Sequence, residues 1–461
     1  MKPDPQILTG WGRHPKVPGR EVRSPDLESL TEDAVLTRGL ARSYGDSSLP
    51  PPDHPQVAAT PLANRILRFD AETGILRAEA GLSLAEMNRL FLPRGWFTPV
   101  TPGTRFVTLG GMVAADVHGK NHHVAGTFGR HVRRLRIRLA PRGGDGGGGR
   151  PGPVVTCSPE EFPELFYATL GGMGLTGHIL EVEVALERVP SPWILAETER
   201  FPSLGPFLEG LERASRDWPL TVGWIDALAT GAAMGRGILH RGRWAEPAEA
   251  PAGAPSAQHR LPFPPLPVEL PSGLLSRPSI LAFNALYWHR HPAGVKRHVT
   301  SPESFFYPLD AIEGWNRLYG ARGFTQYQCV LPKPGAAAKA RRFLELFTSL
   351  SRLGSASFLC VLKDCGEEGE GILSFPKPGI SLALDLPVGR HTQELVDRLN
   401  ERVLEEGGRI YLAKDAFTRP EHFRRMEGER LERFQAIRRE VDPDGWIRSA
   451  QSVRLFGDSS G

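Results

Sequence analysis

The sequence predicts an α+β fold with a sizeable buried core. Residues 26–190 alternate short β-like and helical runs separated by glycines, and residues 191–408 mix strands with longer helices such as 336–354. A polar-faced helix is expected over 419–441, ended by the sequence DPDGW. A chain of 461 residues, 40% of them hydrophobic, is long enough for two or three domains.

The segment ILRFDAETGILRAEAGLSLAEMNRLFLPRG, residues 66–95, is the best example of this mixed pattern. Its first half predicts a strand, a tight turn and a second strand, and its second half predicts a helix that begins at Ser83. Glu86 follows Ser83 by three residues, which is the spacing of a capping box. Strands and a helix in such close succession favour an α+β domain.

Two segments are expected to be loops. APRGGDGGGGRPGP, residues 140–153, stands between two β-like runs and predicts a hairpin loop; a phosphate loop is the alternative, although no helix follows to supply an anion-binding N-terminus. Residues 243–279 are rich in proline and alanine, which indicates a mobile loop. Its apolar half, LPFPPLPVELPSGLL, is either a coil packed along the surface or a lid that contacts lipid.

Composition and charge argue against several classes of protein. No run approaches the roughly 18 apolar residues of a membrane-spanning helix and the first residues lack a signal-peptide profile, so we expect a cytoplasmic protein, or one held peripherally at a membrane. The net charge of +4 is mild, which argues against nucleic-acid binding. The cysteines have no CxxC spacing and are expected to be reduced, buried thiols: Cys157, Cys329, Cys360 and Cys365.

Lysine is scarce in this chain. Only nine of the 56 basic residues are lysines, so a lysine retained within a motif indicates a need for a compact charge with an adjustable pKa. Lys120, Lys363 and Lys414 are candidates on this ground, with chance retention as the alternative.

The stretch ADVHGKNHH, residues 115–123, gathers three histidines, a lysine and an aspartate. A zinc site is one interpretation, because His118 and His122 have the spacing of a helical ligand pair. Gly119 and Asn121 disfavour a helix there, and the glutamate of an HExxH motif is absent. We therefore expect no metal.

Three glycine-broken loops point to a different ligand: TRGLARSYGDSS (37–48), PGTRFVTLGG (102–111) and LGGMGLTGHI (170–179). Gly110 and Gly111 are expected to expose backbone N–H groups where a ligand approaches closely. The loops favour a large dinucleotide bound across backbone donors, without the GxGxxG of a Rossmann fold; three ordinary turns are the alternative.

Together these segments resemble a known group of proteins. RGLARSYGD, PGTRFVTLGG, DVHGKNHH and GGMGLTG are similar to the flavin-binding segments of the vanillyl-alcohol oxidase / p-cresol methylhydroxylase (PCMH) superfamily. The likeness extends nearly end to end and is strongest to the decaprenylphosphoryl-ribose 2′-oxidase subfamily, through LTGWGR (8–13), YPLDAIEGWNRLYGARGFTQYQCVLP (307–332), LSFPKPG (373–379) and GGRIYLAKD (407–415).

The resemblance implies non-covalent FAD and three segments: a PCMH-type FAD-binding domain over 1–190, a substrate-binding domain with an antiparallel sheet and flanking helices over 191–408, and a C-terminal segment, 409–461, that returns to the FAD domain. Many relatives attach FAD through a histidine where this chain has Tyr44, so a releasable flavin is expected. The implied flavin contacts are Thr37, Arg38, Gly39, Leu40, Ala41, Arg42, Ser43, Tyr44, Gly45, Asp46, Ser47, Gly103, Thr108, Leu109, Gly110, Gly111, His118, Ile179 and Tyr411.

The resemblance also implies the residues of a reaction site. Lys414 matches the family's catalytic lysine, and Lys120 and Gln328 match polar groups beside it; oxidation of an alcohol needs a base at the hydroxyl and positive charge nearby. An ordinary surface lysine at 414 and a strand residue at 328 are the alternatives. The implied substrate contacts are Lys363, Gln326, Trp224, Phe306 and Ser381.

Four positions depart from the subfamily pattern. Ala383 stands where a cysteine near the flavin is expected, Ser381 replaces an asparagine, Phe306 replaces a pocket tyrosine, and Ala450 replaces an aspartate. These changes leave the implied flavin chemistry intact and predict indifference to thiol-directed inhibitors.

The implied activity is FAD-dependent oxidation of the 2′-hydroxyl of a polyprenyl-phosphate-linked pentose to a 2′-keto sugar. An NAD(P)-dependent short-chain reductase would then complete epimerisation to the arabinose form, a precursor of cell-wall arabinan. The alternatives are an FAD-linked aldonolactone or alditol oxidase acting on a free sugar, such as D-arabinono-1,4-lactone oxidase, and a non-enzymatic flavin-binding protein.

Overall fold

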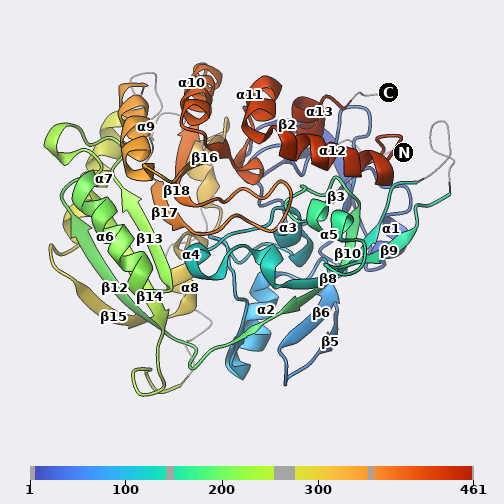
Figure 1. Ribbon diagram of the computed structural model, residues 1–461, viewed down its shortest axis with the longest axis horizontal. Coiled ribbons are helices and arrows are strands. Elements are labelled where there is room, and N and C mark those ends of the chain that lie inside the picture. The colour runs from blue at the N-terminus through green and yellow to red at the C-terminus, as the bar shows by residue number, and fades with distance from the viewer. Residues whose placement is uncertain (1–5, 142–149, 254–275, 351–356, 358, 459–461) are drawn as a thin grey trace.

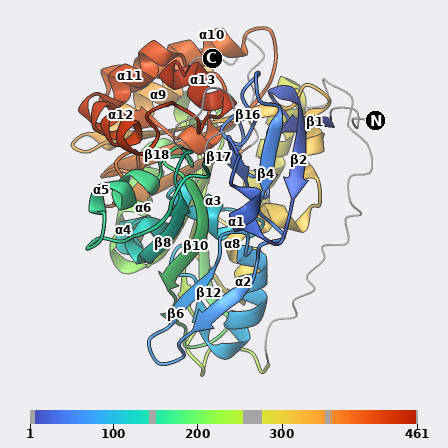
Figure 2. The ribbon, with the colours of Figure 1, turned by 90° about the vertical axis from the view of Figure 1, so that its right-hand side faces the viewer.

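Three β-sheets of four or more strands, with helices packed on them, organise the part of the chain that the structure describes (Figures 1 and 2). A computed structural model describes residues 6–141, 150–253, 276–350, 357 and 359–458. The combination of largely antiparallel sheets with interspersed helices confirms the α+β fold. Among the described residues, no helix has the length and apolar character needed to cross a bilayer.

Two of the sheets come from the first 190 residues. One has the order β1 (Gln6–Thr9), β2 (Lys16–Arg23), β4 (Gln56–Ala59), β3 (Thr37–Arg38). The other has the order β5 (Ile66–Phe69), β6 (Ile75–Glu79), β10 (His178–Ala185), β8 (Val132–Arg138), β9 (Val154–Cys157). A short pair joins β7 (Trp96–Phe97) to β11 (Glu187–Arg188). The accompanying helices are α1 (Leu27–Leu30), α2 (Leu84–Phe91), α3 (Leu109–Ala114), α4 (His122–Ala125) and α5 (Pro163–Thr169).

The strand, turn, strand and helix predicted for residues 66–95 are confirmed. β5 and β6 pair antiparallel, and α2 begins after Ser83. The Ser83 hydroxyl accepts a hydrogen bond from the Glu86 amide at 3.2 Å, and the Glu86 carboxylate accepts one from the Ser83 amide at 3.3 Å, which completes the capping box.

The third sheet is antiparallel throughout and forms the wall of the site described below. Its order is β15 (Lys296–Thr300), β12 (Ile194–Phe201), β14 (Gly237–Trp244), β13 (Leu220–Ile225), β17 (Cys360–Cys365), β18 (Gly379–Pro387), β16 (Phe324–Pro332), β19 (Arg409–Ile410). One face packs against α6 (Leu204–Asp217), α9 (Ala336–Leu350) and α10 (Thr392–Glu405). Because side chains alternate along a strand, every second residue points to the opposite face. Also in this half are α7 (Arg277–Arg290) and α8 (Pro302–Phe306).

The two predicted loops have different outcomes. β8 and β9 pair antiparallel with Arg138 opposite Val154, as expected of a hairpin around 140–153, although residues 142–149 lie outside the described part of the chain. The loop predicted over 243–279 is too long at both ends, since residues 243–244 complete β14 and residues 277–279 begin α7. Its central part, 254–275, is outside the described residues.

The single helix predicted over 419–441 is wrong. Gly428 interrupts it with a φ of 52°, so the chain forms α11 (Pro420–Glu427) and α12 (Glu429–Val441). A residue in this left-handed region cannot continue a right-handed helix, and glycine adopts it without a side-chain penalty. The predicted end before DPDGW is correct. Helices α9 to α12 and α13 (Ala450–Phe456) lie along one edge of the molecule (Figure 1).

The C-terminal residues contact the N-terminal loop 37–48. The Tyr44 amide donates a hydrogen bond to the Ala413 carbonyl at 2.8 Å. Arg454, from α13, donates to both carboxylate oxygens of Asp46 at 2.8 Å and to Asp415 at 2.9 Å. A β-carbon on Gly45 would lie 1.8 Å from the Asp415 carbonyl oxygen, so only glycine allows this approach. The first and last parts of the chain therefore build one structure.

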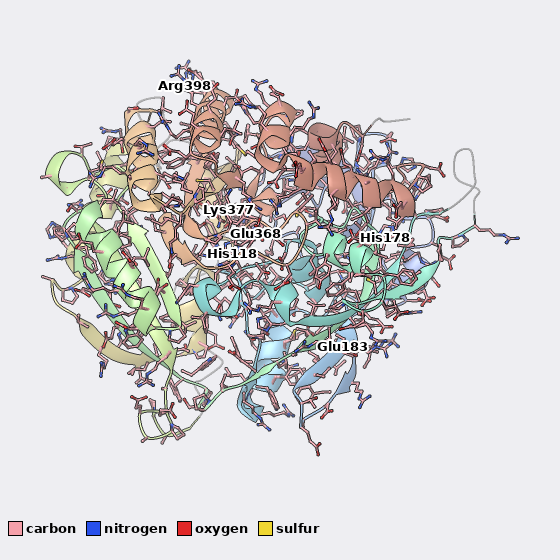
Figure 3. All side chains as sticks on the ribbon, viewed as in Figure 1. His118, His178, Glu183, Glu368, Lys377 and Arg398 are labelled. Atoms are coloured by element: carbon pink, nitrogen blue, oxygen red, sulfur yellow. The ribbon has the colours of Figure 1, made fainter. Side chains whose placement is uncertain are left out.

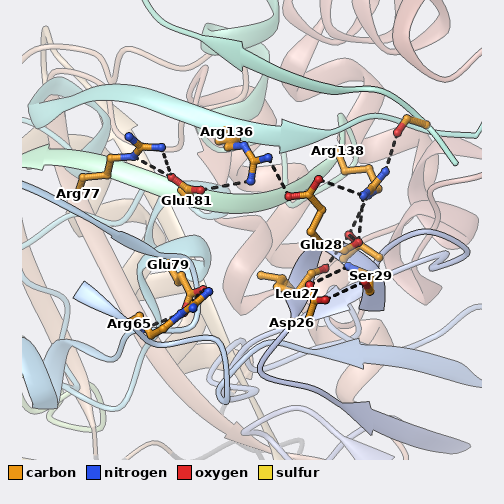
Figure 4. A network of polar contacts seen from close by, with 12 residues as sticks. Asp26, Leu27, Glu28, Ser29, Arg65, Arg77, Glu79, Arg136, Arg138 and Glu181 are labelled. Carbon is orange, nitrogen blue, oxygen red and sulfur yellow. Dashed lines mark hydrogen bonds and ion pairs between the residues drawn. The ribbon is translucent and has the colours of Figure 1, made fainter. Parts of the chain in front are cut away.

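A chain of ion pairs on the five-stranded sheet also fixes α1 (Figure 4). Glu181 on β10 pairs with Arg77 at 2.7 Å and with Arg136 at 3.2 Å. Arg136 in turn pairs with Glu28 at 2.8 Å, and the Arg138 guanidinium donates to the Glu28 carbonyl at 3.0 Å. These partly exposed contacts hold α1, which precedes loop 37–48 in the chain, against the five-stranded sheet.

Arg454→Met is expected to lower the free energy of unfolding by about 3 kcal/mol, because it leaves two nearly buried carboxylates, Asp46 and Asp415, without their common partner. Arg433→Met is the matched control, since the Arg433–Glu164 pair is exposed on both sides and should contribute less than about 1 kcal/mol. Urea unfolding of both variants measures the difference. Equal losses would contradict the central role given to Arg454.

Candidate active site

A cavity of about 970 Å³ lies between the N-terminal loops and the eight-stranded sheet. This volume is at the upper end of the range for small-molecule sites. The walls come from residues 37–44 and 101–120, from alternate residues of strands β12 to β18, from α7 and α8, and from residues 411–414. The cavity therefore brings together segments from across the whole sequence.

Loop 37–48 presents a set of backbone donors to this cavity. Within the described residues, the amides of Leu40, Ala41, Arg42 and Ser43 have no hydrogen-bond partner. Ala41 has a φ of 54°, and a left-handed residue in such a loop turns successive N–H groups towards one side, as in a nest that binds anions. The Arg42 guanidinium lies 4.0 Å from the Trp11 ring centroid, and its buried Nε has no partner. This arrangement fits the pyrophosphate of a dinucleotide.

The predicted flavin contacts divide into two groups. The cavity is lined by Thr37, Arg38, Gly39, Leu40, Ala41, Arg42, Ser43, Tyr44, Ser47, Gly103, Thr108, Gly111, His118 and Tyr411. The structure places five others behind this wall: Gly45, Asp46, Leu109, Gly110 and Ile179.

The prediction that Gly110 and Gly111 expose free N–H groups is wrong. The Gly110 amide donates to the Ala80 carbonyl at 2.8 Å, and the Gly111 amide to the Thr108 hydroxyl at 3.2 Å. A β-carbon on Gly110 would approach that of Ala80 to 3.0 Å. Gly110 therefore permits α3 to pack closely on the strand, whereas Gly111 opens directly onto the cavity.

His118 lies near the centre of the molecule, between the two larger sheets (Figure 3). Its ring packs against Phe375 and Tyr411 at centroid distances of 5.3 and 5.1 Å. The Gln328 amide donates to His118 Nε2 at 3.0 Å and to the Ser381 hydroxyl at 3.2 Å. Burial, reinforced by Lys363, holds the pKa of His118 well below its ordinary value, so the ring is neutral and its Nδ1, buried without a partner, is available as a donor.

Four of the nine lysines line the same cavity, and three of them are the lysines that the sequence singled out, Lys120, Lys363 and Lys414. Lys120 Nζ donates to the Phe306 carbonyl at 2.9 Å, and Lys414 Nζ lies 3.7 Å from the centroid of the Tyr44 ring. Lys363, on β17, has no hydrogen-bond or ion-pair partner among the described residues. The scarcity of lysine in the sequence thus identified three residues that the fold brings together.

Burial changes the protonation of these lysines. Desolvation, with repulsion from Lys363, lowers the pKa of Lys120 and of Lys414 to about 7, and Asp385 offsets part of the effect on Lys414. Asp310 is the only carboxylate among the described residues that line the cavity. The cavity is therefore positively charged and holds amines that lose their proton near neutral pH.

The remaining predicted substrate contacts also line the cavity. They are Gln326, Trp224, Phe306 and Ser381, and Ala383 lies beside them. Sequence reasoning missed Asp385, which accepts hydrogen bonds from Gln326 at 2.5 Å and from Tyr319 at 2.9 Å. Burial raises its pKa to about 6. A lone aspartate in the apolar strand ISLALDLP was the available signal for it.

Comparison with known proteins agrees with these features. A family model described as an FAD binding domain matches residues 31–144, which include the donor loop, Thr108 and His118. The protein is therefore an FAD-dependent oxidoreductase. It is 34% identical to decaprenylphosphoryl-β-D-ribose oxidase of Mycolicibacterium smegmatis over 97% of both chains. An uncharacterised protein of Streptomyces coelicolor is also 34% identical, over 81% of this chain and 100% of that protein.

The chain belongs to the decaprenylphosphoryl-β-D-ribose oxidase family, within the vanillyl-alcohol oxidase / PCMH superfamily. The likeness to a putative D-arabinono-1,4-lactone oxidase of Neurospora crassa is more limited: 29% identity over 26% of this chain and 19% of that protein.

Acid precipitation of the purified protein is expected to release all of its flavin into the supernatant. Tyr44, which the resemblance aligns with the expected attachment position, is buried against Lys414, and burial raises the pKa of its phenol well above the ordinary value. A neutral phenol is a poor nucleophile. Absorbance of supernatant and pellet measures the distribution, and flavin that stays with the pellet would contradict the prediction.

Thiol-directed reagents are expected to leave activity unchanged. All four cysteines are free and buried and none lines the cavity; burial raises the pKa of Cys157 and of Cys365 to about 12, so the reactive thiolate is scarce. Ala383→Cys is the matched control, because it places a thiol in the cavity wall. Mass spectrometry of both proteins after treatment locates the modified residues. A reagent adduct on a cavity residue of the parent protein would refute the prediction.

Proposed function

We propose that the protein oxidises the 2′-hydroxyl of a polyprenyl-phosphate-linked pentose, of the decaprenylphosphoryl-ribose type, to a 2′-keto sugar. The observation that carries the proposal is the convergence of Lys120, Lys363 and Lys414 on a cavity lined by a single described carboxylate. Such a cavity attracts an anionic substrate and contains an amine that can accept a proton at neutral pH.

Lys414 is the proposed base. With its pKa near 7, about half of its amine is neutral at that pH, and it takes the proton of the 2′-hydroxyl as the C–O bond becomes a carbonyl. When bound, FAD supplies the acceptor for the hydride that leaves the same carbon. The Tyr44 ring, 3.7 Å from Lys414 Nζ, fixes the position of the amine and stabilises its protonated form after the transfer.

The neighbouring groups orient the sugar and stabilise charge. Lys363 lies close enough to depress the pKa of both other lysines, so its ammonium also stabilises negative charge that develops on the substrate oxygen. Gln328 is held by His118 and Ser381, which fixes a side-chain amide facing the cavity as a contact for sugar hydroxyls. Lys120 is held by the carbonyl of Phe306, at the end of α8.

The roles proposed for these residues also assign a function to each domain of the chain. We infer that residues 1–190 form the FAD-binding domain, that 409–461 return to complete it, and that 191–408 form the substrate-binding domain. The contacts between loop 37–48 and residues 413–415 support the return, and the eight-stranded sheet supports the substrate assignment.

The 2′-keto product must be reduced to give the arabinose configuration. An NAD(P)-dependent short-chain reductase is therefore the proposed partner. It would reduce the 2′-keto group of the product and so give a precursor of cell-wall arabinan. A substrate with a polyprenyl tail also calls for peripheral contact with a membrane.

Lys414→Arg is expected to reduce the rate of flavin bleaching by a polyprenyl-phosphoryl ribose analogue by about 10² to 10⁴, measured anaerobically by stopped flow. Arginine keeps the positive charge but cannot serve as a base at neutral pH. Lys377→Arg, outside the cavity, is the matched control. A Lys414→Arg enzyme with more than a tenth of the parental rate would remove Lys414 from this role, and bleaching by free alditols would instead favour a free-sugar oxidase.

The bleaching rate is also expected to rise with pH through about 7 and to level off near pH 8. Below its folded pKa Lys414 is protonated and cannot accept a proton, and above it the amine is fully available. A base with the ordinary lysine pKa of about 10.4 would give a rate still rising tenfold per pH unit at pH 9. That continued rise, or a flat profile between pH 6 and 8, would contradict the lowered pKa.

A further inference from the structure

The outer half of the cavity has a cationic wall that the proposed hydride transfer does not use. Its positive charge comes from Arg290 and Lys296, and the rings of His240, His291 and His298 line the cavity beside them. Lys296 on β15 and His240 on β14 lie opposite the same residue of β12, Thr198. His298 is two residues from Lys296 and so points to the same face of the sheet. The wall is thus a product of strand register.

The opposite face of these strands is built differently. There Arg241 and Arg297 each pair with Glu197, at 2.9 and 2.6 Å. On the cavity face, no ion pair joins Lys296 or Arg290 to a carboxylate within the described residues. The strands therefore pair their outward arginines with Glu197, whereas Lys296 on the cavity face and Arg290 on α7 are left for an external anion.

The cationic wall continues into the reaction site. Burial lowers the pKa of His240 to about 3, and His291, Lys120 and His298 each add to this effect. His240 is therefore close to Lys120 on one side and to the rest of the wall on the other. An anion bound at the wall would therefore lie near Lys120.

An aromatic row leads from the same place to the surface. Trp224 packs edge-on against Tyr287 at a centroid distance of 4.9 Å, and Tyr287 stacks on Phe283 at 5.9 Å with an interplanar angle of 8°. Trp224 is buried, whereas Phe283 is 46% exposed and Leu286, on the same helix, is 73% exposed. An apolar chain can follow these rings from the cavity to solvent.

We propose that the cationic wall binds the phosphodiester of the substrate and that the aromatic row guides the first isoprene units of its lipid outwards. The inference rests on the proposed function and specifies which part of the cavity recognises the lipid phosphate. Guanidinium and ammonium groups without carboxylate partners are suited to a phosphodiester, and aromatic faces are suited to an apolar chain.

Isothermal titration calorimetry of the FAD-loaded protein with farnesyl phosphate and with inorganic phosphate tests this assignment. Lys296→Gln should raise the Kd of both ligands about fivefold, as expected for loss of a partly solvated charge interaction. Phe283→Ala should raise only the Kd of farnesyl phosphate, by a similar factor. Lys296→Arg should restore parental binding. Arg297→Gln is the matched control, because it removes the same charge one residue away on the opposite face.

Equal Kd values for Lys296→Gln and Arg297→Gln would overturn the proposal. So would a loss that appears only in sedimentation with phosphatidylglycerol vesicles, since the cations would then serve a membrane surface rather than the substrate phosphate. Neither probe is oxidised, so binding is measured independently of turnover. If both phosphates bind as expected but no polyprenyl-phosphoryl pentose bleaches the flavin, the phosphate site stands and the proposed reaction fails.

Discussion

The contact between loop 37–48 and residues 411–415 is the constraint on which the site depends. Tyr44 is held through its backbone by Ala413, and its ring receives Lys414. The same loop supplies the free amides that fit a pyrophosphate, so the donor cradle and the proposed base belong to one interlocked unit. Arg454 closes it from the C-terminal side through two carboxylates. The backbone hydrogen bond between Tyr44 and Ala413 therefore fixes the position of Lys414, the proposed base, relative to loop 37–48, which holds the free amides.

The unpaired positive charge of the cavity has an energetic cost in the absence of ligand. The folded pKa values of Lys120 and Lys414 lie near 7, below the unfolded value of about 10.4, so the unfolded chain binds more protons between these values. The contribution of these lysines to stability consequently rises with pH across that window and is lost as pH falls towards 7. Any anion that binds in the cavity would offset this cost.

Much of the architecture was predictable because its signals are local. The capping box at Ser83 and the strand pair before it can each be recognised in a short stretch of sequence, and the scarcity of lysine needs only a count over the chain. The interruption at Gly428 was missed because an isolated glycine within a helical pattern is often tolerated, and only the positive φ distinguishes a break. Gly110 was misassigned because its closest neighbour, Ala80, is distant in sequence.

The features that sequence reasoning could not reach are those that depend on register. His240, Lys296 and His298 stand in unremarkable polar strands, and nothing in their spacing shows that β12 aligns them on one face. The place of Asp385 in the site likewise depends on its hydrogen bonds with Gln326 and Tyr319, which lie on other elements. The resemblance of short segments to a known family predicted FAD and the lysines Lys120, Lys363 and Lys414. The cationic wall, in contrast, can be recognised only from the pairing of the strands.

The close approach of Gly45 to Asp415 also constrains how the protein is made. The two residues are separated by most of the chain, and α13, which clamps them, ends at Phe456. The N-terminal sheets are synthesised long before these partners exist. The cradle formed by loop 37–48 therefore reaches its folded geometry only after α13 has been synthesised.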